Sequence, residues 1–261
     1  MHNIIEACNL TKKFRLKKTG KGLKNLFKPQ YKTVVAVNNI SFAIKPGERV
    51  AFIGPNGAGK STLMNMMTGY LAPTSGQIEI LGSSISDAPL AAKNVIGFLP
   101  EGAPLYPDLS VRNFLNYMAE LRGFSAADKK KRIEEIAALA NIDTVMEQKI
   151  ETLSKGYLRR VGFAQSILSD PPLLLLDEPT DGLDPNQKEH IRSLINRMGK
   201  NKTILISTHL LEEAQTICNR IIIINKGQIV ADGCLNDILK QNKTDSLEKV
   251  FKKLTTTTEA I

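Results

Sequence analysis

Short apolar segments and longer amphipathic segments alternate along most of the chain. Apolar runs, and runs that alternate apolar with polar residues, predict strands at 33–44, 49–54, 76–82, 94–100, 172–179, 203–209 and 220–233. Apolar residues spaced near 3.6 predict helices at 110–124, 126–142, 187–200 and 211–219. Apolar strands that alternate with helices predict an α/β fold with a largely parallel sheet, covered on both faces.

Length and composition narrow the class of protein. A chain of 261 residues with 42% hydrophobic content can form one large domain or two lobes that share a core. Its three cysteines, Cys8, Cys218 and Cys234, are too scattered for a disulfide framework and indicate a reducing cytosol. No apolar segment approaches the roughly 20 residues that cross a bilayer, and the first residues lack the pattern of a signal peptide. We therefore expect a chain that neither spans a membrane nor is exported.

The net charge of +9 has a local origin. The segment 12–32 holds nine basic residues and no acid, so the rest of the chain is neutral. A broad basic face for nucleic acid is therefore not expected. We interpret 12–32 as a solvated loop, mobile like the end 255–261. The alternative is contact with an anionic partner such as lipid headgroups, worth about 1 kcal/mol per cation.

The stretch GPNGAGKST fits the phosphate-loop pattern G-x-x-x-x-G-K-[ST], between a predicted strand and a predicted helix. Its glycines let the backbone turn tightly and aim N–H groups at phosphate oxygens. Lysine supplies a charge for the β- and γ-phosphates, and the first hydroxyl suits Mg²⁺. The residues expected to bind the nucleotide here are Gly54, Pro55, Asn56, Gly57, Ala58, Gly59, Lys60, Ser61 and Thr62, with Lys60 also catalytic and Ser61 a metal ligand.

Two acids, Asp177 and Glu178, end the apolar run LLLLDE, where ligands of open α/β sheets bind. Asp177 can hold Mg²⁺ directly or through water, and Glu178 can orient and polarise the attacking water. The alternative, that the two acids only cap a helix, leaves the apolar lead-in unexplained.

With these motifs in place, the chain resembles the nucleotide-binding subunit of an ATP-binding cassette transporter over roughly residues 3–240. The family's signature segment, usually LSGGQ, stands here as LSKGY at 153–157. The resemblance implies that Ser154 and Gly156 contact the γ-phosphate of ATP held by the other subunit of a head-to-tail dimer. Ser154 as a helix N-cap, with Gly156 for close approach, suits an anion.

Further residues of this chain match motifs of the family position by position. Asp184 in DGLD resembles the acid of the loop through which subunits communicate, and His209 resembles the catalytic switch histidine that bonds the γ-phosphate and the attacking water. Phe14 is the candidate that stacks on adenine, with Tyr31 also close. Glu101 stands where the family usually has glutamine and can approach Mg²⁺, while it adds charge and loses an amide donor.

The signature segment also departs from the family, because Lys155 and Tyr157 replace glycine and glutamine and are followed by Leu158 and Arg159. This variant is similar to cassettes paired with exporter-type membrane subunits, including gliding-associated and multidrug groups.

The resemblance implies a P-loop NTPase fold with a RecA-like parallel core sheet, an N-terminal antiparallel β subdomain and an inserted helical subdomain. We expect a cassette over 1–240, with the helical subdomain at about 104–165, a basic insertion at about 12–32 and a short tail at 241–261. It further implies ATP and Mg²⁺ as cofactors, a homodimer or paired cassette, and a separate membrane permease. The subunit would lie at the cytoplasmic face of the cell membrane and drive export.

Two alternative functions fit the sequence less well. A soluble cassette ATPase acting on ribosomes or DNA usually has two cassettes or coiled-coil or zinc insertions, and none is seen here. A GTPase would need the acid of NKxD, whereas NKGQ at 225–228 lacks it and reads as a hairpin turn.

Overall fold

The computed structural model describes residues 3–17 and 31–256 and confirms the α/β class. In chain order the elements are β1 (Ile5–Lys17), β2 (Tyr31–Ile44), β3 (Arg49–Ile53), α2 (Lys60–Met67), β4 (Ser75–Ile80), β5 (Ser83–Ser84), α3 (Pro89–Asn94), β6 (Ile96–Leu99), α4 (Val111–Leu121), α5 (Ala126–Ala140), the 3-10 turns η1 (Asp143–Val145) and η2 (Ile150–Thr152), α6 (Lys155–Ile167), β7 (Leu173–Asp177), α7 (Pro185–Met198), β8 (Thr203–Thr208), α8 (Leu211–Ile217), β9 (Arg220–Asn225), β10 (Gln228–Gly233), α9 (Leu235–Gln241) and α10 (Leu247–Thr255). Every strand and helix expected from the apolar pattern is present.

The central sheet has the order β10-β9-β3-β8-β7-β6, and only β10 runs antiparallel to its neighbour. Every residue of β7 is buried, which explains its unbroken leucine run, since helices cover both faces of a parallel sheet. Strands β3, β7 and β8 lie side by side, so their carboxyl ends meet at one edge of the sheet.

A second, antiparallel sheet has the order β2-β1-β4-β5. It packs against α2 and the central sheet through a shared apolar core that includes Ile5, Leu10, Ile40 and Phe52. The expected antiparallel N-terminal region is therefore present.

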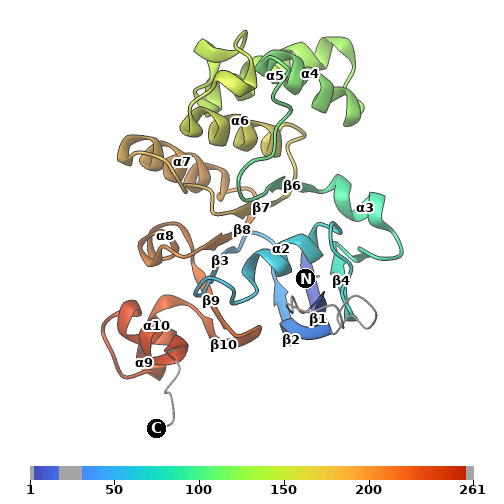
Figure 1. Cartoon of the computed structure of the whole chain (residues 1–261). Coiled ribbons are helices and arrows are strands. Elements are labelled where there is room, and N and C mark those ends of the chain that lie inside the picture. The colour runs from blue at the N-terminus through green and yellow to red at the C-terminus, as the bar shows by residue number, and fades with distance from the viewer. Residues whose placement is uncertain (1–2, 18–30, 257–261) are drawn as a thin grey trace, which may run out of the picture.

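Helices α4, α5 and α6 form a separate layer beyond the β6 end of the sheet (Figure 1). Ser110, Ser125 and Ser154 each accept a hydrogen bond from a backbone N–H of the turn that they precede, so all three helices begin with a side-chain cap. Asn141 ends α5 in the left-handed conformation, with φ 58°. These helices share a core with β6 and β7, which fixes α6 beside the ends of those strands.

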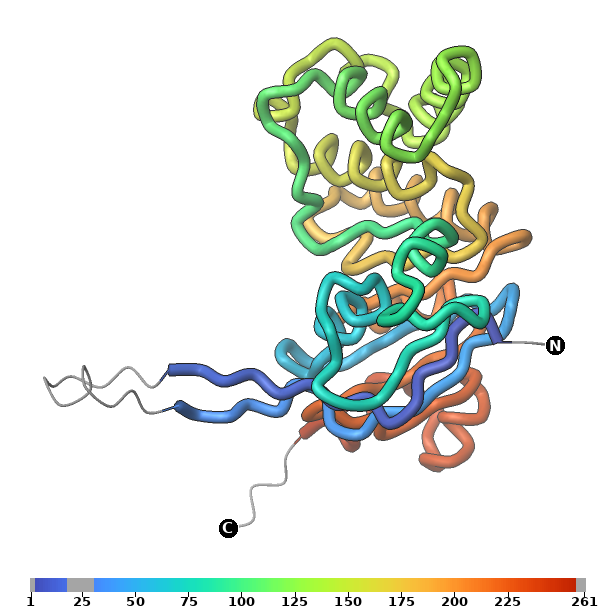
Figure 2. The backbone as a smooth tube through the Cα atoms, turned by 90° about the vertical axis from the view of Figure 1, so that its right-hand side faces the viewer, coloured from blue at the N-terminus to red at the C-terminus, as the bar shows by residue number. Residues whose placement is uncertain are grey.

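The description of the basic segment as a loop is wrong for residues 12–17 and 31–32, which belong to β1 and β2. Beyond Thr11, where its pairing with β4 ends, β1 pairs with β2 from Lys12 to Lys17. This two-stranded ribbon projects from the body (Figure 2). Phe14 and Leu16 alternate with Lys13, Arg15 and Lys17, so this segment has the period of a strand, although its high charge favoured the interpretation as a solvated loop. Residues 18–30 and 257–261, expected to be mobile, lie outside the described residues.

The chain after residue 240, expected as a short tail, includes α10. Leu247 and Val250 of this helix are buried in a core with Ile221 and Ile223 of β9. The turn at 225–228 is confirmed as a β-hairpin, with Lys226 and Gly227 both at positive φ. Among the described residues, no helix is both long enough and apolar enough to be a membrane span.

Candidate active site

The phosphate loop connects β3 to α2, as the sequence predicts, and its glycines serve two purposes. Gly57 and Gly59 have φ of 79° and 110°, a conformation that side chains disfavour. Gly54 does not: a Cβ there would lie 2.3 Å from the carbonyl oxygen of Ile224 in β9. The expectation that Gly54 serves the tight turn is thus corrected, because it is required for packing against the neighbouring strand.

Ala36 is a site residue that the sequence did not indicate. It is the extra residue of a β-bulge in β2, because Lys13 pairs with Val35 and Lys12 with Val37. Its carbonyl would lie 2.4 Å from a Cβ on Gly59. The residues that line the hollow at the phosphate loop are Ala36, Asn56, Gly57, Ala58, Gly59, Lys60, Ser61, Thr62 and Glu101.

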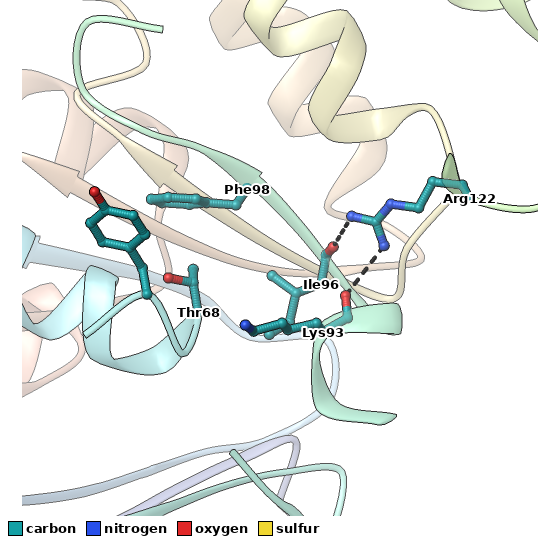
Figure 3. A pocket seen from close by; sticks show the side chains of 6 residues that line it. Thr68, Lys93, Ile96, Phe98 and Arg122 are labelled. Carbon is teal, nitrogen blue, oxygen red and sulfur yellow. Dashed lines mark hydrogen bonds between the residues drawn. The ribbon is translucent and has the colours of Figure 1, made fainter. Parts of the chain in front are cut away.

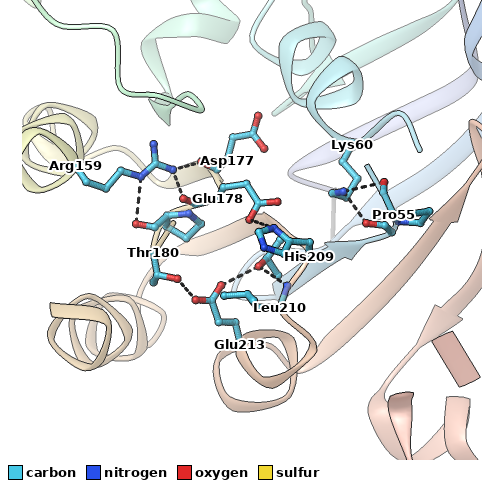
Figure 4. A network of polar contacts seen from close by, with 12 residues as sticks. Pro55, Lys60, Arg159, Asp177, Glu178, Thr180, His209, Leu210 and Glu213 are labelled. Atoms are coloured by element: carbon cyan, nitrogen blue, oxygen red, sulfur yellow. Dashed lines mark hydrogen bonds and ion pairs between the residues drawn. The ribbon is translucent and has the colours of Figure 1, made fainter. Parts of the chain in front are cut away.

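Lys60 is buried at the start of α2, and its Nζ donates to the carbonyl oxygens of Gly54 at 2.7 Å and Pro55 at 3.3 Å. Burial lowers the pKa of Lys60, while the charges of Glu178 and Asp177 act in the opposite direction. Figure 4 shows Lys60 facing these acids across the site. The lysine therefore lies within the electrostatic reach of both carboxylates that end β7.

Asp177 meets a test of fit for a metal ion. The side chain is 2% exposed, and its Oδ1 has no hydrogen-bond partner. A buried carboxylate oxygen without a donor is costly, and a hard cation is a suitable partner. Within residues 3–17 and 31–256, no three His, Cys, Asp or Glu side chains cluster as a metal site. A Mg²⁺ ion here would need phosphate oxygens to complete its shell, as is usual for this ion.

Glu178 follows β7 and turns its side chain toward His209, which follows β8. Oε2 of Glu178 lies 2.9 Å from Nδ1 of His209. Glu178 has φ 49°, an uncommon conformation for a residue with a Cβ, and its N–H donates to the carbonyl of Ser207 at 2.9 Å. Such backbone geometry is typical of functional positions. The structure thus joins two residues that the sequence assigned to the same chemistry.

Ser154 and Gly156 lie at the start of α6. The Ser154 side chain is exposed and accepts from the N–H of Tyr157 at 3.3 Å. A Cβ on Gly156 would lie 2.3 Å from Oε1 of Gln187, at the start of α7. Asp184 caps that helix by accepting from the N–H of Gln187 at 3.0 Å. The two segments expected to face a second subunit therefore touch each other.

The strand register of the β1–β2 ribbon distinguishes between the two residues that are candidates for stacking on adenine. Phe14 pairs with Val34, two residues before Ala36, whereas Tyr31 is five residues before Ala36. At about 3.4 Å per residue, Tyr31 is about 17 Å along the strand from the hollow. The register favours Phe14 over Tyr31 as the stacking residue.

A buried network at the back of the site was not predicted, because it needs residues far apart in the sequence. Glu213 of α8 is 1% exposed and accepts hydrogen bonds from Thr180 and, at 2.9 Å, from Thr208. Burial raises the pKa of Glu213. Thr180 precedes the DGLD loop and Thr208 precedes His209, so one carboxylate connects the two loops.

The comparisons agree with this geometry. The family model for the ABC transporter matches residues 37–181. The chain belongs to the ABC transporter family. The linearmycin resistance ATP-binding protein LnrL of Bacillus subtilis is 34% identical over 221 residues, which are 84% of this chain and 71% of that protein. The Nod factor export ATP-binding protein I of Paraburkholderia xenovorans is 36% identical over 210 residues, 79% of this chain and 68% of that protein.

Solved structures of ABC cassettes share the fold. One is a dimeric cassette in a post-hydrolysis state with ADP and phosphate bound, which matches with a TM-score of 0.77 and 26% identity over 88% of this chain and 98% of its own. Another, the ATP-binding subunit of an ABC transporter, matches with a TM-score of 0.82 and 29% identity over 97% of this chain and all of its own. The protein is the ATP-binding subunit of an ABC transporter, and it is an ATPase.

Proposed function

We propose that two copies of this cassette close on two ATP molecules and drive a separate exporter in the membrane. In each site, the phosphate loop of one copy holds the triphosphate, and the start of α6 from the other copy covers it. The exposed, capped start of α6 supports this arrangement, because a helix N-terminus with a serine and a close-packed glycine attracts an anion. The match to a dimeric cassette with ADP and phosphate supports it as well.

In the proposed mechanism, Glu178 is the base that orients and polarises the attacking water, and His209 holds Glu178 and the γ-phosphate in position. The 2.9 Å contact between Glu178 and His209 is the single observation that carries this assignment. Lys60 and the N–H groups of the phosphate loop bind the phosphates. Ser61 and Asp177 would hold Mg²⁺, with Glu101 near them, and the ion would neutralise charge on the β- and γ-oxygens.

The experiment that tests the mechanism is Glu178→Gln in the purified full chain. The amide keeps the size of the side chain but cannot accept a proton. We expect ATP binding to persist, a dimer to accumulate with ATP, and hydrolysis to fall by about 10²- to 10⁴-fold. Glu151→Gln, at an exposed glutamate, is the matched control and should hydrolyse ATP as wild type does. Wild-type turnover in Glu178→Gln would refute the assignment.

A groove on the side of the molecule suits a short cytoplasmic helix of the permease (Figure 3). Its apolar wall comes from Tyr70, Ile96 and Phe98, and Tyr70 is 84% exposed. Arg122 of the helical layer donates to the carbonyl oxygens of Lys93 and Ile96, both at 3.3 Å, so the groove is formed where the two layers meet. A partner seated there would sense their relative movement.

Membrane attachment separates the transporter from a soluble ATPase acting on ribosomes or DNA. If the subunit is peripheral at the cytoplasmic face, native protein should sediment with the membranes of its own cells, and Tyr70→Asp should release it. Hydrolysis by the purified variant should be unchanged, since Tyr70 follows the carboxyl end of α2, whereas the phosphate loop lies at the amino end of that helix. Co-sedimentation with ribosomes or DNA would instead favour the soluble alternative. The names of the two relatives, for resistance and for export, support an export direction.

The ribbon of β1 and β2 supports a second contact of this subunit, with anionic lipid. Lys13, Arg15 and Lys17 alternate along β1 and therefore share one face, which they share with Tyr31 across the strand pair. Tyr31 is 58% exposed. Three cations near an anionic bilayer are worth about 3 kcal/mol, a partition difference of more than about 100-fold.

Flotation with vesicles of anionic or neutral lipid tests this contact. Replacing Lys13, Arg15 and Lys17 by glutamine should weaken binding to anionic vesicles by about 100-fold. The matched control replaces the three exposed lysines of α10, Lys249, Lys252 and Lys253, and should bind as wild type does. Equal flotation of the two triple variants would leave the ribbon without a lipid role.

A further inference from the structure

Arg159 makes an unusual set of contacts from the second turn of α6 (Figure 4). The side chain is 5% exposed, and among the residues that the structure describes its guanidinium donates only to main-chain carbonyl oxygens. Nη1 donates to Pro100 at 2.9 Å and Nε to Pro179 at 3.3 Å, while Nη2 donates to both Asp177 and Glu178. One side chain thus binds the segment before Glu101 and the segment that carries both catalytic acids.

Three successive carbonyls, those of residues 177, 178 and 179, converge on this guanidinium. Converging carbonyl dipoles repel one another, and a buried carbonyl also needs a donor. The planar fork of arginine has five N–H groups that meet both needs, whereas a lysine ammonium is a compact charge with three. Arg159 therefore stabilises the backbone turn in which Glu178 has its positive φ.

The charge of Arg159 has a second role. Burial lowers the pKa of Arg159, and the negative charges of Asp177, Asp181, Glu178 and Glu101 act against that shift. Arg159 and Glu101 line the same hollow beside the catalytic acids. Glu101 stands where glutamine is expected, and it adds a negative charge close to Lys60 and the phosphate loop. The guanidinium of Arg159, which lines the same hollow, offsets that charge.

We propose that Arg159 is a positioning residue for ATP hydrolysis that acts in two ways: its fork fixes the backbone of Asp177 and Glu178, and its charge compensates Glu101. Arg159 lies on the helix whose first residues cover the partner's nucleotide, so it also links closure of the dimer to the acids of its own subunit. This inference rests on the proposed roles of Glu178 and of the start of α6.

The two roles separate by substitution in the full chain. Arg159→Lys keeps the charge and loses the fork, so kcat should fall about tenfold or more while KM for ATP stays close to wild type. Arg159→Gln loses both, so KM should rise in addition, because Glu101 then repels the triphosphate. In the double variant Arg159→Gln with Glu101→Gln, the KM for ATP should return to the wild-type value. The effects of the two substitutions on KM should therefore be coupled by about tenfold, as is usual for neighbouring residues.

Arg160→Gln is the matched control. Arg160 is the next residue and equally buried, but it donates to Asn141 at 2.8 Å and stacks on Tyr157, away from the acids. Glu101→Gln should not improve its KM. If the KM of Arg159→Gln is not restored by Glu101→Gln, or if Arg159→Lys has wild-type kcat, the proposal is overturned.

The same set of variants also covers a failure of Arg159→Gln to fold and distinguishes this proposal from the proposed mechanism. If Arg159→Gln does not fold, Arg159→Lys and Arg159→Met together with Glu101→Gln carry the test, because methionine fills the buried space without charge. Glu178→Gln in the same assay distinguishes the two proposals. If Glu178→Gln hydrolyses ATP at the wild-type rate, the proposed mechanism is wrong. If Glu178→Gln is inactive but Glu101→Gln does not restore the KM of Arg159→Gln, only the role of Arg159 is refuted.

Discussion

Nδ1 of His209 lies 2.9 Å from Oε2 of Glu178, and this contact joins the ends of the neighbouring strands β8 and β7. The imidazole restricts the carboxylate to one direction. His209→Ala should therefore lower kcat by about tenfold or more, while ATP affinity changes little. Steady-state hydrolysis and nucleotide titration measure the two quantities. His190→Ala, on α7, is the control, and an unchanged kcat in His209→Ala would contradict a positioning role.

The adenine contact is decided by a pair of aromatic substitutions. Phe14 lies two residues along the ribbon from Ala36 by register, and Tyr31 lies five, so only Phe14 is expected to reach a base in the hollow. Phe14→Ala should weaken ATP binding by about tenfold, as the loss of a stacked base does. Tyr31→Ala should not. If equilibrium binding shows instead that Tyr31→Ala weakens ATP binding and Phe14→Ala does not, Tyr31 is the stacking residue.

Packing at Gly227 connects the β9–β10 turn to the phosphate loop, because its N–H donates to the carbonyl of Ala58 at 2.9 Å. A Cβ on Gly227 would lie 2.7 Å from the carbonyl oxygen of Ala36, whereas one on Gly82 would meet nothing within 4 Å. Both glycines have positive φ, 74° and 73°. Each alanine should cost about 1–2 kcal/mol of unfolding free energy for backbone strain.

Gly227→Ala should cost more than Gly82→Ala, since it also displaces main chain, and it alone should weaken ATP binding. Urea unfolding and nucleotide titration compare the two variants. Equal losses of stability with unchanged binding would show that the close approach does not matter.

The buried carboxylate of Glu213 gives a prediction for pH. Burial raises its pKa above the ordinary value of 4.5, so between the two pKa values the folded state binds more protons than the unfolded state. The free energy of unfolding due to this group is highest below about pH 4.5 and falls as pH rises through the folded-state pKa. Glu213→Gln removes the titration.

Thermal unfolding across pH measures the effect. The melting temperature of Glu213→Gln minus that of wild type should increase from pH 4.5 upward and then level off. Glu248→Gln, at an exposed glutamate of α10, should show no such trend. A difference independent of pH would contradict the assignment.

The sequence predicted those parts of the site that follow one another along the chain. The phosphate loop and the acids after β7 are short local patterns, and they lie where the strand ends of a parallel sheet must bring them. The network of Glu213 with Thr180 and Thr208 could not be predicted, because it brings α8 and the end of β8 together with Thr180, which follows the neighbouring strand β7. The sequence predicts no role for Arg159, since its partners are carbonyl oxygens, which no side-chain pattern records. In the ribbon, Phe14 and Leu16 do alternate with the cations, and the strand was missed because the interpretation as a loop gave more weight to the nine basic residues of 12–32.

The absence of a side chain on Gly156 brings α6 and α7 together at their first turns, where Gln187 fills the space. A Cβ there would lie 2.3 Å from Oε1 of Gln187, so the amide of Gln187 would have to leave the space between the two helices. The first turns of α6 and α7 thus meet through the side chain of Gln187. In the proposed dimer, a movement at the start of α6 would reach α7 through this amide.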